Sequence, residues 1–297
     1  YSQNVVDLCP VGALQSRAFL YSSRVWYLQS TPSVCPSCER GCNIDIWHRR
    51  EEWKLRSVNV AANSAIARVT PRENAAVNGP WMCDTGRDLG ALLDRPRATQ
   101  AMIEGKSVTL ETAIEAARKR IAASHAPIAL VSNWGSNEEL RAFAEALAQR
   151  CTVLIKIDRH AHPGEVISDD LLIRADKNPN TAGARAVFPD AKLWSPHGSD
   201  ARLPHGHDLV LAWGEGFEVT SLPSREPVIL LGSYESEQNA RAAVFIPISI
   251  QTERRGHYTN FAGQLNAFEP CFKPRAGVID AEALFPALAN ARVEATA

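Results

Sequence analysis

The pattern of apolar and polar positions divides the chain into two parts with different predicted structure. Up to about residue 95, short segments alternate polar and apolar side chains, which is typical of half-exposed β-strands. Such strands are predicted at residues 21–30 and 43–48, with one or two more over 58–69. From about residue 108, apolar positions recur at helical spacing and alternate with apolar runs of strand length. We therefore expect a small β-rich domain followed by an α/β domain.

The second part predicts strands alternating with helices. Residues 109–121 and 138–149 have the spacing of amphipathic helices. The apolar runs predict strands at 127–132, 151–157, 208–212, 228–231 and 243–248. This alternation is typical of a doubly wound sheet whose strands are mostly parallel.

Composition excludes several classes of protein. Hydrophobic residues make up 45% of the chain and charged residues 22%, as in ordinary globular domains. The net charge of −1 gives no support for a nucleic-acid partner. The longest apolar runs are far shorter than the roughly 18 residues of a transmembrane helix, so direct membrane insertion is not expected.

The spacing of the cysteines is the strongest chemical signal. The candidate metal ligands are Cys35, Cys38, Cys42 and Cys83. Three thiolates on one short loop, with a fourth returning from farther along, suit a [4Fe–4S] cluster. A structural zinc site stays open as an alternative, although zinc sites usually offer two short cysteine pairs. A disulfide is less favoured, because clustered C-x2-C cysteines indicate metal chemistry in a reducing compartment.

Cys9 is a candidate ligand of a second cluster. It lies in a Cys-Pro pair after a short apolar run, and a proline follows the last cysteine of ferredoxin-type clusters. The other ligands of such a cluster would precede Tyr1, and the chain begins there without Met, so we expect a fragment or a processed chain. A buried thiol in a turn is the alternative.

Other features carry weaker signals. Trp26, Trp47, Trp53 and Trp81 are expected to fill the small core and to shield the cluster from water. Residues 213–216 (WGEG) lack the third glycine of a dinucleotide site.

The histidine pairs at 160/162 and 205/207 are expected to be solvated and to lie in loops. Cys151 and Cys271 are expected to be inert, buried or half-buried thiols. Asp169 and Asp170 have no nucleophile beside them, so no hydrolase site is indicated.

Several motifs together resemble the C-terminal part of the large iron–sulfur subunit of bacterial NADH:quinone oxidoreductase, respiratory complex I, which is the relative of the mitochondrial 75 kDa subunit. Residues 7–14 (DLCPVGAL) resemble the family's D-x-C-P-V-G-A-L, whose cysteine is the last ligand of a tetranuclear cluster. Residues 35–44 resemble the loop of an extra tetranuclear cluster, and residues 72–87 resemble the segment that carries its fourth ligand. Residues 252–264 resemble a segment shared with molybdopterin oxidoreductases.

The sequence departs from this pattern at two places. The interval from Cys42 to Cys83 is longer than usual for this ligand set, which indicates an inserted loop near residues 53–64. Molybdopterin enzymes commonly have a lysine where Thr85 stands, and threonine cannot supply that charge. The α/β part is also too short to enclose a bis-pterin cofactor. A working molybdenum site is therefore not expected.

The resemblance implies three domains and a role in electron transfer. Residues 1–20 would be the tail of an upstream ferredoxin-like domain, 21–100 the [4Fe–4S] domain, and 101–297 a degenerate molybdopterin-oxidoreductase-like α/β domain. The chain would be a non-catalytic electron-transfer or structural subunit, partnered by other subunits of the peripheral arm on the cytoplasmic side of the bacterial inner membrane. The alternatives are a catalytic molybdopterin-dependent subunit, such as that of a formate dehydrogenase, and a structural zinc-bearing interaction module.

Overall fold

A computed structural model describes residues 1–49, 65–93, 95–157, 159, 161, 163–196, 202–214, 219 and 226–289. The chain forms two compact units, each built from three stretches of sequence. The first unit contains residues 1–95, 161–179 and 251–273, and the second contains 96–160, 180–250 and 274–297. Residues 161–179 and 251–273 therefore belong to the unit that carries the cysteine loop, although in the sequence they follow residues of the second unit.

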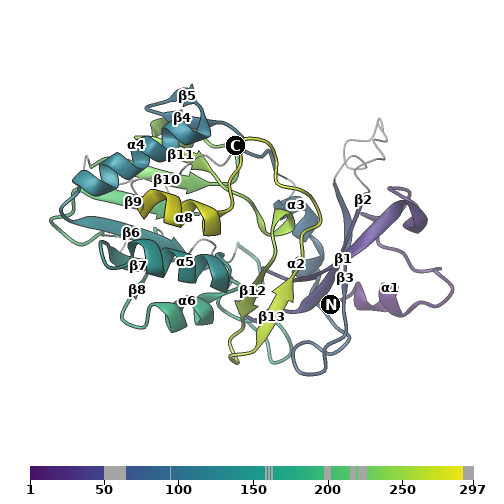
Figure 1. Cartoon of the computed structure of the whole chain (residues 1–297). Coiled ribbons are helices and arrows are strands. Elements are labelled where there is room, and N and C mark those ends of the chain that lie inside the picture. The colour runs from purple at the N-terminus through teal and green to yellow at the C-terminus, as the bar shows by residue number, and fades with distance from the viewer. Residues whose placement is uncertain are drawn as a thin grey trace. The chain divides into compact units, whose positions relative to one another are not determined.

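The first unit is rich in β-structure, as predicted. Its three-stranded antiparallel sheet has the order β1-β2-β3 (Figure 1). The strands are β1 (Leu28–Val34), β2 (Asn43–Arg49) and β3 (Ile66–Pro71). A second antiparallel hairpin consists of β12 (Gly256–Thr259) and β13 (Leu265–Phe268). The helical elements are α1 (Asn4–Leu8), η1 (Val25–Tyr27), α2 (Asp84–Arg87), α3 (Leu89–Leu93) and η4 (Gln251–Glu253).

The strand predicted over residues 21–30 is wrong for most of its length. Tyr21 has a φ of 62° and residues 25–27 form the 3₁₀ turn η1, so the strand begins only at Leu28. The alternation of aromatic and polar residues before Leu28 therefore does not come from a buried sheet face. Of the strand predicted within 58–69, the described part begins at Ile66, and the predicted insertion at 53–64 lies outside the described residues.

The tryptophans do not fill a core as predicted. Trp26 is 67% exposed and Trp81 is 43% exposed, whereas Trp47 is half-buried on β2. Trp53 lies outside the described residues. Aliphatic side chains form the core of this unit instead, together with two of the cysteines. Its buried members are Cys35, Cys42, Ile44, Ile46, Ile66, Val69, Met82, Leu89 and Leu93.

The second unit is an α/β structure around one eight-stranded mixed sheet of order β5-β4-β11-β10-β9-β6-β7-β8. The pairs from β11 to β8 are all parallel, and the edge pairs β11·β4 and β4·β5 are antiparallel. The strands are β4 (Ala101–Ile103), β5 (Lys106–Val108), β6 (Pro127–Ser132), β7 (Thr152–Lys156), β8 (Lys192–Trp194), β9 (Leu209–Trp213), β10 (Val228–Gly232) and β11 (Val244–Pro247). The five strands predicted here are confirmed, with ends shifted by one residue or so. The hairpin β4–β5 and the edge strand β8 were not predicted.

Side chains of the parallel strands alternate between two apolar layers, because successive residues point to opposite faces. On β6, Ala129 and Val131 join one layer, whereas Ile128 and Leu130 join the other. The first layer also receives α4 (Leu110–Ala123), α5 (Asn137–Leu147), α6 (Thr181–Val187) and α8 (Ala281–Ala289) (Figure 1). The short helix α7 (Glu237–Arg241) precedes β11.

Helix starts in this unit follow the local chemistry of the sequence. Thr109 caps α4, and its hydroxyl accepts a hydrogen bond from the backbone N–H of Thr112. Ser136 and Glu139 form a reciprocal capping box at the start of α5. None of the described helices is both long and apolar enough to cross a membrane.

Candidate metal centre

The cysteine loop closes the hairpin between β1 and β2. The last pair of the ladder joins Val34 to Asn43, and directly beyond it the N–H of Cys35 donates to the carbonyl of Cys42 at 2.8 Å. Residues 35–42 therefore form a loop whose two ends are held by cysteines. Gly41 has a φ of +62°, a conformation that suits glycine, and its N–H donates to the carbonyl of Cys38 at 3.3 Å.

Cys83 comes from a different element, directly before helix α2. Within that helix, Gly86 lies against two of the sulfurs. A methyl group built on Gly86 would lie 3.1 Å from Sγ of Cys35 and 3.7 Å from Sγ of Cys83. The contact with Cys83 would be ordinary, but the one with Cys35 would be tight, so a glycine suits this position. This gives a structural role to Gly86, which lies in the segment 72–87 that resembles the family's fourth-ligand segment.

The four candidate ligands are buried, free cysteines. Their exposed fractions are 4% for Cys35, 8% for Cys38, 5% for Cys42 and 9% for Cys83. Burial raises the pKa of Cys35 to about 12, and the sulfurs of Cys83 and Cys38 raise it further. Burial also raises the pKa of Cys42, with added repulsion from the other three sulfurs. Four neighbouring thiolates would repel one another here unless a cation stood among them, so the donor set fits a metal group that displaces the thiol protons.

The arrangement of these four cysteines in two elements bears on which metal group would fit. A zinc ion bound at Zn–S distances of about 2.3 Å requires tetrahedral sulfurs only ~3.8 Å apart. Among the described residues, no three His, Cys, Asp or Glu side chains form a group that could hold a metal ion. The four cysteines nevertheless interact electrostatically and share one buried region. Three thiols on one loop with a fourth from another element suit an iron–sulfur core better than the two short cysteine pairs usual for zinc.

Two asparagines connect the cysteine loop to the segment that leads to Cys83. The side-chain oxygen of Asn78 accepts a 2.9 Å hydrogen bond from the N–H of Asn43, the residue after Cys42. The Asn78 amide donates to the carbonyl of Trp81 at 3.0 Å, and Asn74 donates to the side chain of Asn43 at 2.7 Å. These bonds give a structural role to Asn74 and Asn78 within the segment 72–87 that leads to Cys83.

Two segments from much later in the sequence pack on the cysteine loop. The carbonyl of Asp176 accepts a hydrogen bond from the N–H of Glu39 at 2.9 Å, and the N–H of Phe261 donates to the carbonyl of Glu39 at 3.0 Å. The ring of Phe261 lies beside two guanidinium groups, 5.1 Å from that of Arg40 and 4.0 Å from that of Arg174. No sequence pattern had associated residues 161–179 with the cysteine loop.

Unlike the four buried cysteines, Cys9 is half-buried and lies in a turn after α1. The pKa of its thiol is lowered, chiefly by the backbone N–H of Leu14, which lies 3.5 Å from Sγ, and further by the N–H groups of residues 11–13. A sulfur surrounded by backbone donors is favoured as a thiolate. The turn is joined to the Cys83 segment through Asn4, whose side chain pairs with both the N–H and the carbonyl of Met82.

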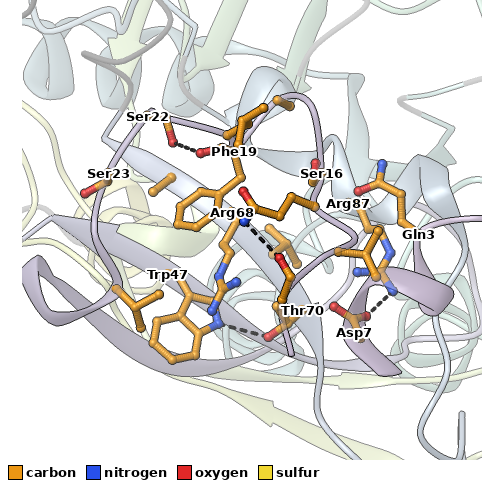
Figure 2. Close-up of a pocket in the computed structure, with 18 of the residues that line it drawn as sticks. Gln3, Asp7, Ser16, Phe19, Ser22, Ser23, Trp47, Arg68, Thr70 and Arg87 are labelled. Atoms are coloured by element: carbon orange, nitrogen blue, oxygen red, sulfur yellow. Dashed lines mark hydrogen bonds and ion pairs between the residues drawn. The ribbon is translucent and has the colours of Figure 1, made fainter. Parts of the chain in front are cut away.

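A cavity of about 930 Å³ lies beside this N-terminal segment and β3. Figure 2 shows the Arg68 guanidinium near the rings of Phe19 and Trp47, at 4.7 Å from each. Trp47 Nε1 donates to Thr70 at 2.9 Å, and Asp7 pairs with Arg87 at 2.5 Å. Cys9 is among the lining residues, but the four buried cysteines are not.

The remaining candidates form no second site among the described residues. His205 is exposed in a loop as expected, whereas His207 is half-buried and hydrogen-bonds the carbonyl of Pro204 through Nδ1 at 2.8 Å. The histidines at 160 and 162, and residues 215 and 216, lie outside the described residues. Cys151 and Cys271 are half-buried as predicted, and burial raises their pKa to about 11 and about 12.

Comparison with known proteins confirms the resemblance predicted from the sequence. Residues 28–95 match the model of the molybdopterin oxidoreductase Fe4S4 domain, which is consistent with the predicted cofactor. The chain is 35% identical over 153 residues to the NADH-ubiquinone oxidoreductase 75 kDa subunit of Reclinomonas americana, covering 49% of this chain and 20% of that protein. It is 36% identical over 104 residues to the mitochondrial NADH dehydrogenase (ubiquinone) iron-sulfur protein 1 of Solanum tuberosum, covering 35% and 12%.

A relative with a different name is similar to the same degree. The NADPH-Fe(3+) oxidoreductase subunit alpha of Geobacter sulfurreducens is 34% identical over 137 residues, covering 45% of this chain and 14% of that protein. The chain thus spans about a fifth or less of the length of these relatives. A solved formyltransferase/hydrolase complex from Methylorubrum extorquens aligns with a TM-score of 0.36 at 11% identity, covering 63% of this chain and 97% of that one, and adds nothing to the assignment.

Proposed function

We propose that this chain belongs to an iron–sulfur electron-transfer subunit of an NADH:quinone oxidoreductase, and that Cys35, Cys38, Cys42 and Cys83 bind one [4Fe–4S] cluster. The observation that carries the proposal is the burial of these four free thiols in one region, with Gly86 against two of the sulfurs, within a segment that matches an Fe4S4 domain. The names of the relatives point to oxidoreductase complexes, and two of those cited are named for NADH and ubiquinone.

The protein's own residues would hold and insulate the cluster. When bound, such a cluster accepts and passes on single electrons. The hairpin base at Cys35 and Cys42 fixes two ligands, and the start of α2 fixes Cys83. Backbone N–H groups near the sulfurs and the surrounding aliphatic core would set the potential by stabilising thiolate charge and excluding water. We assign no catalytic residue to this unit, because its chemistry is confined to the thiols that would ligate iron.

We further propose that Cys9 ligates a second [4Fe–4S] cluster that residues outside this sequence complete. The four backbone N–H groups of residues 11–14 around its sulfur support this role, because they favour the thiolate that iron requires. On this proposal, residues 1–20 belong to a neighbouring cluster domain, 21–100 form the domain of the Cys35 loop, and 101–297 are a reduced molybdopterin-oxidoreductase-type α/β domain.

The α/β unit would hold no molybdenum cofactor. In open α/β sheets, ligands bind at the carboxyl ends of parallel strands. After β6, that position is occupied by protein groups bonded to one another. The Asn180 amide donates to the carbonyl of Gly135 at 2.8 Å and to the side chain of Asn137 at 3.0 Å, and Asn133 donates to Thr181 at 2.8 Å. The amides of Asn133 and Asn180 are engaged in these bonds and so compete with any pterin for the same acceptors, although Asn133 Oδ1 itself accepts no hydrogen bond from the described residues.

In the intact enzyme, the partners would be the other subunits of the peripheral arm, on the cytoplasmic side of the bacterial inner membrane. The Geobacter relative shows that similar chains also occur in an enzyme named for iron reduction. The electron donor and acceptor would therefore depend on those partners, whereas the cluster would belong to this chain.

Iron and sulfide analysis, combined with electron paramagnetic resonance of the dithionite-reduced full chain, tests the proposal. We expect four irons and four sulfides in the Cys35 loop cluster, as in any [4Fe–4S] centre. Cys38→Ser should abolish that signal, and Cys151→Ser, which changes a thiol of the other unit, should leave it intact. One equivalent of zinc without iron, molybdenum in the purified chain, or an unchanged spectrum in C38S would contradict the proposal.

A further inference from the structure

Lys177 is a fully enclosed cation in the cysteine-bearing unit. Its side chain is 3% exposed, and its ammonium donates to the carbonyls of Val166 at 3.1 Å, Ile167 at 2.9 Å and Arg174 at 3.0 Å. Three acceptors for three N–H donors satisfy the charged form of lysine completely. Buried lysines are rare because removing their charge from water costs free energy. The three carbonyls around Lys177, called the carbonyl cage below, therefore suggest a role for its charge.

Glu165 forms a long ion pair with Lys177 and offsets part of its charge. Its carboxylate lies 3.9 Å from the Lys177 ammonium and is 11% exposed. This separation is too long for a hydrogen bond, and the direct partners of the ammonium are carbonyl oxygens, which carry no net charge. The hydrogen bonds of the ammonium are therefore made by uncharged carbonyls, and the Glu165 ion pair compensates its charge in part.

The segment that carries Lys177 is fixed to the cysteine loop, chiefly at Glu39, the residue after Cys38. The carbonyl of Asp176, directly before Lys177, accepts the Glu39 N–H at 2.9 Å, and Arg174 Nε lies 3.3 Å from the Glu39 carboxylate. Burial raises the pKa of the Cys83 thiol, and the charge of Lys177 opposes this shift. The cage thus holds a positive charge on a segment that is bonded to the residue after Cys38.

We propose that Lys177 raises the reduction potential of the cluster held by Cys35, Cys38, Cys42 and Cys83, acting through its buried charge without ligating iron. The inference rests on the proposed function. Reduction adds one negative charge to a cluster already ligated by four thiolates. A fixed cation in a medium of low dielectric constant stabilises the reduced form more than the oxidised form. Glu165 opposes this effect, so the two residues should shift the potential in opposite directions.

The test is a redox titration of the full chain with its cluster, followed by electron paramagnetic resonance. Lys177→Met keeps the length of the side chain and removes its charge, and we expect a lower midpoint potential. Lys106→Gln removes one exposed lysine of the other unit and should leave the potential unchanged. An unchanged potential in K177M with full iron content would overturn the inference.

Glu165→Gln makes the test independent of how well K177M folds. Removing the opposing anion should raise the midpoint potential, because the caged ammonium then acts without compensation. If K177M binds no iron, its potential cannot be measured and E165Q provides the test. An unchanged or lower midpoint potential in E165Q then overturns the inference. A wild-type chain that binds no iron would instead contradict the proposed function, so the two failures are distinguishable.

Discussion

Asn78 and Asn43 connect the two segments that supply the proposed cluster ligands. The Asn78 side-chain oxygen accepts the N–H of Asn43 at 2.9 Å, next to Cys42, while its amide reaches the carbonyl of Trp81, two residues before Cys83. Asn78 itself is 3% exposed. One buried amide therefore joins the loop that carries three cysteines to the element that carries the fourth.

Replacing Asn78 with alanine should destabilise this unit. The change leaves the Asn43 N–H and the Trp81 carbonyl without this partner in a buried site, which costs about 1–3 kcal/mol. Chemical denaturation followed by loss of the iron–sulfur absorbance measures the effect. Gln149→Ala, at an exposed position of the other unit, is the control and should be near neutral. Equal midpoints for N78A and Q149A would contradict the assigned role.

Gly86→Ala should prevent cluster binding although alanine is the better helix former. Its methyl group would lie 2.9 Å from Cε of Met82 and 3.1 Å from Sγ of Cys35, so these atoms must move. Gly90→Ala is the matched control, because the nearest atom there, Cγ2 of Ile66, is 3.4 Å away at an ordinary contact distance. Iron content distinguishes the two variants. Full iron occupancy in G86A would show that the close approach of Gly86 to the sulfurs is unimportant.

The stability of the chain should fall at alkaline pH in part because of Cys151. Burial raises the pKa of this thiol from 9.0 to about 11. Between these values the unfolded thiol is ionised while the folded thiol keeps its proton, so the unfolded state binds fewer protons and stability decreases as pH rises. Cys151→Ala should therefore flatten the dependence of unfolding free energy on pH between about 9 and 11. Parallel curves for C151A and the wild-type chain would refute this.

The correct sequence predictions are those that depend on local physical chemistry. The β6 and β9 strands were predictable because each is a short, continuous apolar run, and α4 was predictable because its apolar residues recur at helical spacing. The wrong prediction at residues 21–30 has a related cause. Aromatic and polar residues alternate there as in a strand, but exposed side chains such as Tyr21 and Trp26 do not fill a sheet face. Alternation indicates a strand only where one face is buried.

The sequence by itself determined the candidate chemistry of this protein, and the tertiary structure decided what surrounds that chemistry. Thiol type and spacing on one short loop are properties of neighbouring residues, so Cys35, Cys38 and Cys42 were identifiable before any fold was known. The contact of Gly86 with two sulfurs, and the carbonyl cage around Lys177, depend on where distant segments pack. Residues 176 and 39 are joined by a backbone hydrogen bond although they lie far apart in the sequence. Because every residue has the same backbone groups, the sequence does not show which of them will pair.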